Sequence, residues 1–207
     1  MTQTASGDGR NVRRERNRLA VIEAAFELVQ EGKVPPSVET VAERAGVSVS
    51  SIFRNFDGLA DMQQQAIELS FAKYGSSYEV ADADAPQVDR VRSHVRDRVE
   101  FYEAAGALLR LSRGRAIDHD PMVEAVARLR TRLADQTRQR FAIEVRGLTP
   151  AAAADLVAII DTITSPEAFE LMAAAHARTS RQISRAWVAT LTSLLEQPTP
   201  QRAKEKS

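Results

Sequence analysis

Hydroxyl, guanidinium and amide groups are concentrated in one short segment of the sequence. Residues 48–55 read SVSSIFRN and contain three serines, one arginine and one asparagine. Serine and asparagine side chains can hydrogen-bond to phosphates or bases, and a guanidinium group can reach a phosphate or a guanine edge. Because Ile52 and Phe56 are one helical turn apart, they are expected to point into a core and leave the polar groups on the outer face. These residue types therefore suit contact with a nucleic-acid duplex.

Two short helices are expected to position these groups. Ser37 is a plausible N-cap for a helix over residues 38–45, and Gly46 permits the backbone conformation that ends it. Ser48 is suited to cap a third helix. A helix, a tight glycine-containing turn and a second helix form the unit that presents its second helix to the DNA major groove. The same corner also occurs as a packed helical hairpin that binds no DNA.

Helical periodicity extends along nearly the whole chain, so the predicted fold class is all-α. The first helix is expected to be about 17 residues long, to end at Gly32, and to bury one face made of Leu19, Ile22, Phe26 and Val29. A fourth helix is expected over residues 57–74, before a linker-like segment. The predicted organisation is a helix-turn-helix domain of three to four helices at 10–74 and a larger helical domain at 75–196, between disordered tails at 1–9 and 197–207.

The composition argues against several kinds of site. The chain has 207 residues, of which 43% are apolar, and its 28 basic and 28 acidic residues cancel. It contains no cysteine, and its histidines, His94, His119 and His176, are scattered rather than spaced as metal ligands. No segment is long and apolar enough to span a membrane and no leader opens the chain, so a cytoplasmic location is expected. Neither a metal nor a cofactor is predicted.

Arginines precede the apolar face of the first predicted helix. Residues 10–18 read RNVRRERNR and contain five arginines and one glutamate. Such a cluster can reach phosphates even when the formal net charge of the chain is zero. The alternative is an ordinary solvated helix start. Arg14 and Arg18 are the candidates for DNA contact in this segment.

The segment from about Leu19 to Met62 resembles the N-terminal DNA-binding domain of the TetR family of bacterial transcriptional regulators. Four features carry the resemblance: the first helix AVIEAAFELVQEG, the corner TVAERAGVS, the recognition helix SIFRNF, and a following helix. The total length and the helical remainder also fit the family. The C-terminal part carries no motif of a particular subgroup.

This resemblance implies roles for individual residues of the corner. The positions that contact the DNA backbone in the family are occupied here by Thr40, Ser48, Phe53 and Asn55. The positions that approach bases or phosphates are occupied by Val49, Ser50, Ser51 and Arg54. The sequence departs from the family where Phe53 and Asn55 replace a common tyrosine and histidine, and where Leu59 replaces a lysine. The hypothesis is that the arginines of residues 10–18 offset these losses through phosphate or minor-groove contacts.

The same resemblance implies that the larger domain pairs two chains and binds a small effector. Apolar residues of the last two long helices fit a four-helix interface between two copies of the chain, although they also fit the core of one chain: Ile159, Ile160, Ile163, Trp187, Leu191, Leu194 and Leu195. Effector contacts are expected from apolar and aromatic residues that are more often plain core: Phe101, Tyr102, Met122, Val126 and Phe141.

The expected function is a ligand-responsive, DNA-binding transcriptional regulator. By the habit of the family, it is a homodimeric repressor that releases a near-palindromic DNA operator when a small molecule binds the C-terminal domain. The alternative is a helical small-molecule carrier or scaffold whose corner binds no DNA. An enzyme is not expected, because the sequence holds no nucleophile with a partnered base, no phosphate-binding glycine loop and no metal-ligand spacing.

Overall fold

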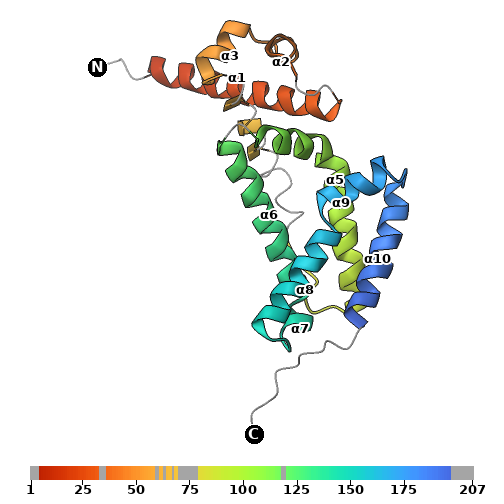
Figure 1. Cartoon of the computed structure of the whole chain (residues 1–207). Helices are drawn as coiled ribbons and strands as arrows, with labels where there is room; N and C mark the ends of the chain where they lie inside the picture. The colour runs from red at the N-terminus through yellow and green to blue at the C-terminus, as the bar shows by residue number, and fades with distance from the viewer. Residues whose placement is uncertain are drawn as a thin grey trace. The chain divides into compact units, whose positions relative to one another are not determined.

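The structure, a computed structural model of the chain, consists of helices. It describes all residues except 1–4, 33–35, 59–60, 63, 67, 70–78, 118–119 and 197–207, and leaves out the side chains of 5–10, 115 and 121. The helices are α1 (Ala5–Gln30), α2 (Val38–Ala45), α3 (Val49–Asn55), α5 (Gln87–Arg115), α6 (Asp120–Arg140), α7 (Ala142–Val145), α8 (Pro150–Ile163), α9 (Pro166–Ala174) and α10 (Ser180–Glu196) (Figure 1). Residues 61–69 are also helical where they are described. No strand occurs in the described residues, and the predicted all-α fold is confirmed.

The chain divides into two compact units. Unit 1 contains Met1–Lys73 and Ala105–Ala127, and unit 2 contains Tyr74–Ala104 and Arg128–Ser207. Each of α5 and α6 therefore contributes one part to each unit. The predicted limits of the two functional domains stay a prediction, because they follow the presumed sites and not the packing. None of the helices in the described part of the chain is both long and apolar enough to cross a membrane.

Helix α1 is longer than the sequence pattern predicted. It has 26 residues, where about 17 were expected. It continues through the arginine-rich residues 11–18, because arginine and glutamate favour helix and no glycine or proline interrupts this stretch. Residues 5–9, predicted to lie in a disordered tail, are helical too. The other tail, 197–207, lies outside the described residues.

The core of unit 1 lies where α1 packs against α2 and α3. Ile22, Phe26 and Val29 are buried as predicted, but Leu19 is 43% exposed, so its assignment to the buried face was wrong. Periodicity fixes the face of a helix but not how far along it the neighbouring helices reach. The buried cluster around this packing is Val21, Ile22, Ala24, Ala25, Leu28, Val41, Ala42, Ile52, Phe56, Met62 and Ala66.

The corner between α2 and α3 is closed by local hydrogen bonds. Gly46 adopts φ 66° and ψ 32°, the left-handed conformation that favours glycine. Its N–H donates to the Glu43 carbonyl at 3.2 Å, and the Val47 N–H donates to the Ala42 carbonyl at 3.0 Å. This pair of bonds is the Schellman motif, and Val47 packs its side chain against the core of unit 1. The corner is therefore fixed by backbone geometry, as the sequence predicted.

Gly46→Ala is expected to lower the free energy of unfolding by about 1 kcal/mol, because a Cβ disfavours the left-handed backbone. An added Cβ meets no atom within 4 Å, so the cost comes from the backbone and not from a clash. Urea unfolding of both proteins measures the change. Gly114→Ala, at an open position in α5, is the control and is expected to stabilise the chain. A Gly46→Ala protein as stable as the parent would contradict this account of the corner.

Unit 2 contains a cluster of aromatic side chains around Tyr102. Tyr102 contacts Phe101, Phe169 and Trp187, with ring centroids 5.6, 5.7 and 6.5 Å apart. Tyr102 and Trp187 are buried, and Phe169 is half-buried. Edge-on and tilted ring pairs of this kind add to the free energy gained by burying their surface. Helices α9 and α10 also pack directly on each other.

The apolar residues of α8 and α10 divide between the core and the surface of unit 2. Ile160 and Leu191 are fully buried and Trp187 is 3% exposed, so these three belong to the core of one chain and not to an interface between chains. Ile159 is 45% exposed, and the remaining members, Ile163, Leu194 and Leu195, are half-buried. The sequence did not separate the two sets because α8 is apolar on more than one side.

Buried arginines join the helices of unit 2. Arg90 holds the Glu144 carboxylate through two hydrogen bonds of 2.6 Å. Burial alone would raise the pKa of Glu144, but hydrogen bonds from Arg90 and Gln87 outweigh it and leave this pKa below its ordinary value. Arg140 is paired with Asp97 at 2.8 Å. These bonds satisfy charges that would otherwise be costly to bury.

His94 lies inside unit 2 in the neutral form. Its Nε2 is 3.1 Å from the Thr164 hydroxyl oxygen, and that hydroxyl donates to the Ile160 carbonyl, so Nε2 carries the proton. The ring contacts Phe141 edge-on at 5.3 Å. Burial lowers the pKa of His94 well below its usual 6.5, and the positive charges of Arg98 and Arg140 lower it further.

The free energy of unfolding is therefore expected to fall as the pH drops below 6.5. The unfolded chain takes up a proton at His94 there and the folded chain does not, which costs up to about 1.4 kcal/mol per pH unit. Above that pH the histidine adds nothing to the slope. His94→Gln should remove this part of the slope, measured by urea unfolding between pH 7 and about 5. His176→Gln, at an exposed histidine, should leave it unchanged. An unaltered slope in His94→Gln would rule out this role.

Candidate nucleic-acid interface

The first turn of α3 is built around the Ser48 hydroxyl. Ser48 caps the helix by accepting the Ser51 N–H at 3.2 Å, which confirms the predicted N-cap. Its oxygen also lies 3.0 Å from the Ser50 hydroxyl and 2.9 Å from the Ser51 hydroxyl. Arg54 donates to the Ser51 hydroxyl at 3.1 Å. The three serines and Arg54 therefore form one connected polar surface that runs from the N-cap of α3 to its last turn.

The outer face of α3 is accessible. Ser48, Ser50 and Arg54 are exposed, and the Phe53 side chain is 59% exposed. Ile52 and Phe56 are buried at 2% and 3%, as predicted. An exposed phenylalanine on a polar helix face is not stabilised by burial in the core of its own unit. Its ring is free to make apolar contact with a sugar or a thymine methyl. The helix thus presents hydroxyl, guanidinium and aromatic groups on one side.

Three further predicted contact residues have partners within unit 1 or are partly covered. Thr40 lies beside the Ser37 N-cap of α2, with 2.9 Å between their hydroxyl oxygens. Val49 is half-buried and packs against the core of unit 1. Ser51 is half-buried too. Their polar atoms and methyl groups lie at the N-terminal ends of α2 and α3, where free backbone amides also favour an anion.

Arg14 connects α1 to the C-terminal end of α3. Its Nε donates to the Asn55 side-chain oxygen at 3.1 Å, and its Nη2 approaches the Arg54 carbonyl at 3.4 Å. Asn55 therefore directs its amide oxygen toward α1. A guanidinium that holds a helix terminus in this way helps to fix the orientation of α3. Sequence spacing gave no signal for this pair, which is 41 residues apart.

Arg18 connects α1 to the helical residues that follow α3. Its Nε donates to the Gln65 side-chain oxygen at 2.9 Å, and the Gln65 amide donates to Asp61 at 2.7 Å. Asp61 in turn accepts the Asp57 backbone N–H at 3.0 Å. Arg18 thus belongs to a network inside unit 1. Leu59, predicted to replace a DNA-contacting lysine, lies outside the described residues.

Arg44 fixes α2 to α1 on the same unit. It donates to both carboxylate oxygens of Glu31, at 2.8 and 2.9 Å, and to Glu27 at 3.3 Å. The hydrogen bonds that Arg44 donates to Glu31 raise the pKa of Arg44 above its ordinary value, so it stays charged. This bidentate pair was not predicted, because its members are distant in sequence and carry no motif. It helps to hold the angle at which the corner leaves α1.

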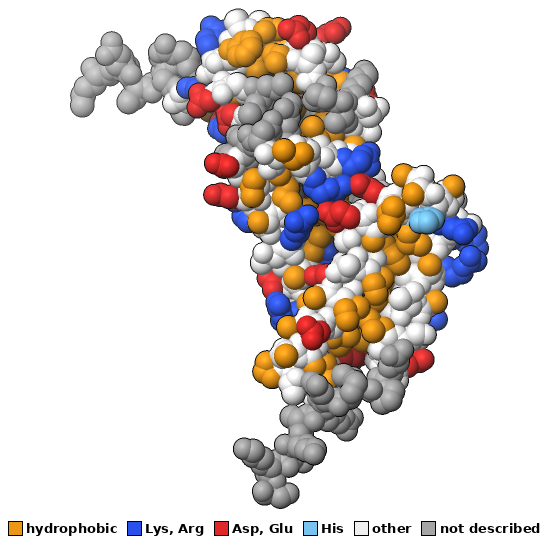
Figure 2. Space-filling model, in the orientation of Figure 1, with side chains coloured by type: hydrophobic (Ala, Val, Ile, Leu, Met, Phe, Trp, Pro, Cys, Tyr) orange, Lys and Arg blue, Asp and Glu red, His pale blue; other side chains and the backbone are white. Residues whose placement is uncertain are grey.

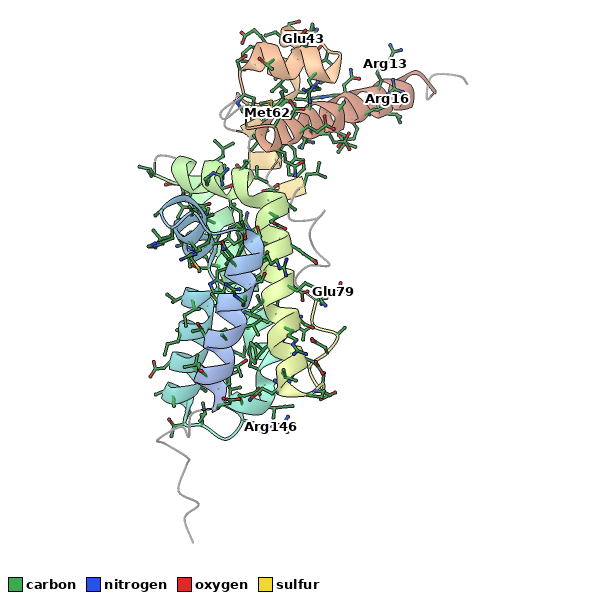
Figure 3. All side chains as sticks on the ribbon, turned by 90° about the vertical axis from the view of Figure 1, so that its right-hand side faces the viewer. Arg13, Arg16, Glu43, Met62, Glu79 and Arg146 are labelled. Atoms are coloured by element: carbon green, nitrogen blue, oxygen red, sulfur yellow. The ribbon has the colours of Figure 1, made fainter. Side chains whose placement is uncertain are left out.

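Two arginines of α1 remain available to a ligand. Arg13 and Arg16 are exposed and make no hydrogen bond or ion pair with the described residues. Both lie on the N-terminal half of the helix (Figure 3). Exposed arginines without partners can bind phosphate at little cost, since no existing bond has to break. They are better placed for this than Arg14 and Arg18.

Unit 2 contains an open pocket with a volume of about 590 Å³. It is lined by α6, α8, the start of α9 and Arg98 of α5. None of the predicted effector contacts lines it: Phe101, Tyr102 and Phe141 are buried core residues of unit 2, while Met122 and Val126 belong to unit 1. The described residues contain no group of three or more acidic or histidine side chains arranged to hold a metal ion.

Comparison with solved structures decides which fold this is. A TetR-family transcriptional regulator from Streptomyces coelicolor superposes with a TM-score of 0.72 and 16% identity, over 87% of this chain and 82% of that one. A putative TetR-family regulator from Rhodococcus sp. gives 0.58 and 15%, over 88% of this chain and all of that one. The chain has the TetR-family fold. The resemblance of the sequence to TetR-family regulators is thus confirmed at the level of the fold.

A further solved structure with this fold contains a bound small molecule. The multidrug binding protein EbrR, solved as a complex with imidazole, gives a TM-score of 0.60 and 19% identity, over 88% of this chain and 97% of that one. Comparison of the sequence with protein-family models gives no match, and comparison with curated proteins gives none. At 15–19% identity, the similarity to these solved structures is a similarity of fold.

Proposed function

We propose that the chain is a non-enzymatic transcriptional regulator that binds a DNA operator as a homodimer and releases it when a small molecule binds unit 2. The observation that carries this proposal is the exposed polar face of α3. This helix belongs to a corner in which Ser37 caps the start of α2 and Ser48 caps the start of α3. A packed hairpin without a ligand needs no connected set of three serines and an arginine on its outer side. The proposed DNA contacts are Thr40, Ser48, Val49, Ser50, Ser51, Phe53 and Arg54.

The arginines of α1 are proposed to act in two ways. Arg13 and Arg16 contact phosphates beside the groove, because they are exposed and have no partners among the described residues. Arg14 and Arg18 position α3 and the helix after it, and Arg14 does so together with Asn55. This assignment narrows the hypothesis that the whole arginine segment contacts DNA.

The proposed surface for pairing two copies of the chain lies on unit 2. Hydrophobic side chains gather over α8 and α10, where Ile159 is 45% exposed and Ile163, Leu194 and Leu195 are half-buried (Figure 2). An apolar face that a monomer leaves in water is typical of a subunit interface. A two-fold dimer through these helices pairs two recognition helices, so the operator is expected to be near-palindromic.

Binding of the purified chain to DNA upstream of its own gene tests the proposal. Fluorescence anisotropy at low salt should show saturable binding that competitor DNA of random sequence does not remove. A chain that binds small molecules in unit 2 but gives no anisotropy change with any duplex is a carrier, the alternative predicted from the sequence. The 590 Å³ pocket is compatible with both functions, so only the DNA measurement separates them.

A further inference from the structure

We infer that the pocket of unit 2 binds an organic carboxylate with an apolar body. This inference rests on the proposed function, because it names the chemical class of the effector. The volume of about 590 Å³ falls in the usual range for a small-molecule site. Apolar side chains make its walls: Leu133, Ala134, Ala154, Val157, Ala158 and Pro166. These walls suit an aromatic ring or a short aliphatic chain.

Three arginines line the pocket, against two acidic residues. Arg98 comes from α5, and Arg130 and Arg138 come from α6. The acidic residues are Asp161 and Glu167, and each is already paired with an arginine of the pocket, at 3.0 and 3.2 Å. The lining therefore carries one positive charge in excess, three minus two.

The two outer arginines can exchange their present partners for a ligand. Arg130 pairs with Glu167 and Arg138 pairs with Asp135, and all four side chains are at least 45% exposed. Exposed ion pairs of this kind contribute little in water. Each pair engages one terminal nitrogen of its guanidinium, so further N–H donors are available. A carboxylate is the ligand group that takes two of these donors in a bidentate bond.

The inner arginine is fixed by the protein and keeps one donor unsatisfied. Arg98 is 2% exposed and donates to Asp161, to the Thr137 hydroxyl and to the Leu133 carbonyl. Its Nε is buried without a hydrogen-bond partner. Its many bonds within the protein keep Arg98 in place when a ligand binds, and its charge is part of the net positive charge of the lining. The remaining Nη1 approaches the Tyr102 hydroxyl at 3.4 Å.

A cationic ligand fits the same pocket poorly. It would have to share Asp161 with Arg98, since one oxygen of this carboxylate already accepts from both Arg98 and Thr137. It would also lie close to Arg130 and Arg138, and like charges at short range in a partly dry site repel strongly. The balance of charge therefore favours the anion.

Matched ligands test the inference on the purified full chain without DNA. Calorimetric titration with benzoate and octanoate is compared with benzamide and octanamide, and with benzylamine and octylamine, which keep the apolar body and change the charge. We expect at least one carboxylate to bind about ten-fold or more tightly than its amide and its amine. Arg130→Gln/Arg138→Gln should lose this preference, whereas Arg132→Gln, an exposed arginine of α6 outside the pocket, should keep it.

Each other outcome overturns the inference. Tighter binding of an amine or an amide, a preference unaffected by Arg130→Gln/Arg138→Gln, or no binding of either carboxylate at about 10 mM contradicts it. Far-ultraviolet circular dichroism of the double variant checks that the helices are intact. Failure here leaves the proposed function standing if the chain still binds DNA. Carboxylate binding by a chain that binds no DNA would instead support the pocket and remove the regulator.

Discussion

Arg54→Gln is expected to weaken operator binding by about ten-fold to a hundred-fold for each subunit, since a guanidinium contact to a base or phosphate contributes about 1–3 kcal/mol. Arg54 is exposed on the outer face of α3 and is held by the Ser51 hydroxyl. If it contacts a phosphate, the slope of log affinity against log salt also falls by about 0.9 for each subunit bound. Anisotropy titrations over a series of KCl concentrations measure both quantities.

Arg14→Gln is expected to weaken binding without changing the salt slope. Its guanidinium holds Asn55 and the Arg54 carbonyl, so its loss reorients α3 and removes no phosphate contact. Arg13→Gln should do the reverse and lower the slope, because this side chain has no partner among the described residues. Arg146→Gln, an exposed arginine of unit 2, is the control for charge alone. A slope lowered by Arg14→Gln as much as by Arg13→Gln would contradict the positioning role.

The second large effect is expected from Ile159→Asp. A carboxylate on the exposed part of the α8 surface would have to be buried without a partner in a dimer, so the chain should become monomeric. A monomer reaches only one half-site at a time and loses the gain from linked binding, about a hundred-fold or more in affinity. Sedimentation velocity and anisotropy measure the two consequences.

Ile143→Asp provides the matched control for this substitution. Ile143 is 50% exposed on α7, so the change adds the same charge to an equally accessible isoleucine. It should leave both the mass and the operator affinity unchanged. A parent chain that sediments as a monomer while binding the operator tightly would refute the proposed interface, and so would an Ile159→Asp protein that stays dimeric.

Features set by neighbouring residues were predictable from the sequence. Ser37 and Ser48 cap their helices as expected, because an N-cap bond reaches only three residues along the chain. Gly46 was identifiable because few other residues adopt its backbone conformation. The burial of Ile52 and Phe56 followed from helical spacing. The outer face of α3 was predicted by the same local rules.

Features that depend on tertiary packing were not predictable. Leu19 has the spacing of a buried residue but lies beyond the reach of its neighbours, and Ile160 and Ile159 are adjacent yet fall on opposite sides of the core boundary. The pairs Arg14–Asn55 and Arg98–Asp161 join residues 41 and 63 positions apart. No periodicity encodes such pairs. The first pair led us to assign Arg14 a positioning role in place of a DNA contact, and the second pair lies in the lining of the unit 2 pocket. The aromatic residues predicted to contact an effector do not line the 590 Å³ pocket, whose walls combine aliphatic and charged side chains, and their proposed role stays a prediction.

Selection from a library of random DNA duplexes tests the central proposal most directly. The purified chain is incubated with the library at moderate salt, and the bound duplexes are amplified and sequenced over several rounds. We expect enrichment of one near-palindromic sequence whose half-sites are centred about one helical turn or slightly more apart. The same selection with Arg54→Gln should lose or change the enriched half-site. If no sequence is enriched over the starting library, the chain does not read DNA and is not the proposed regulator.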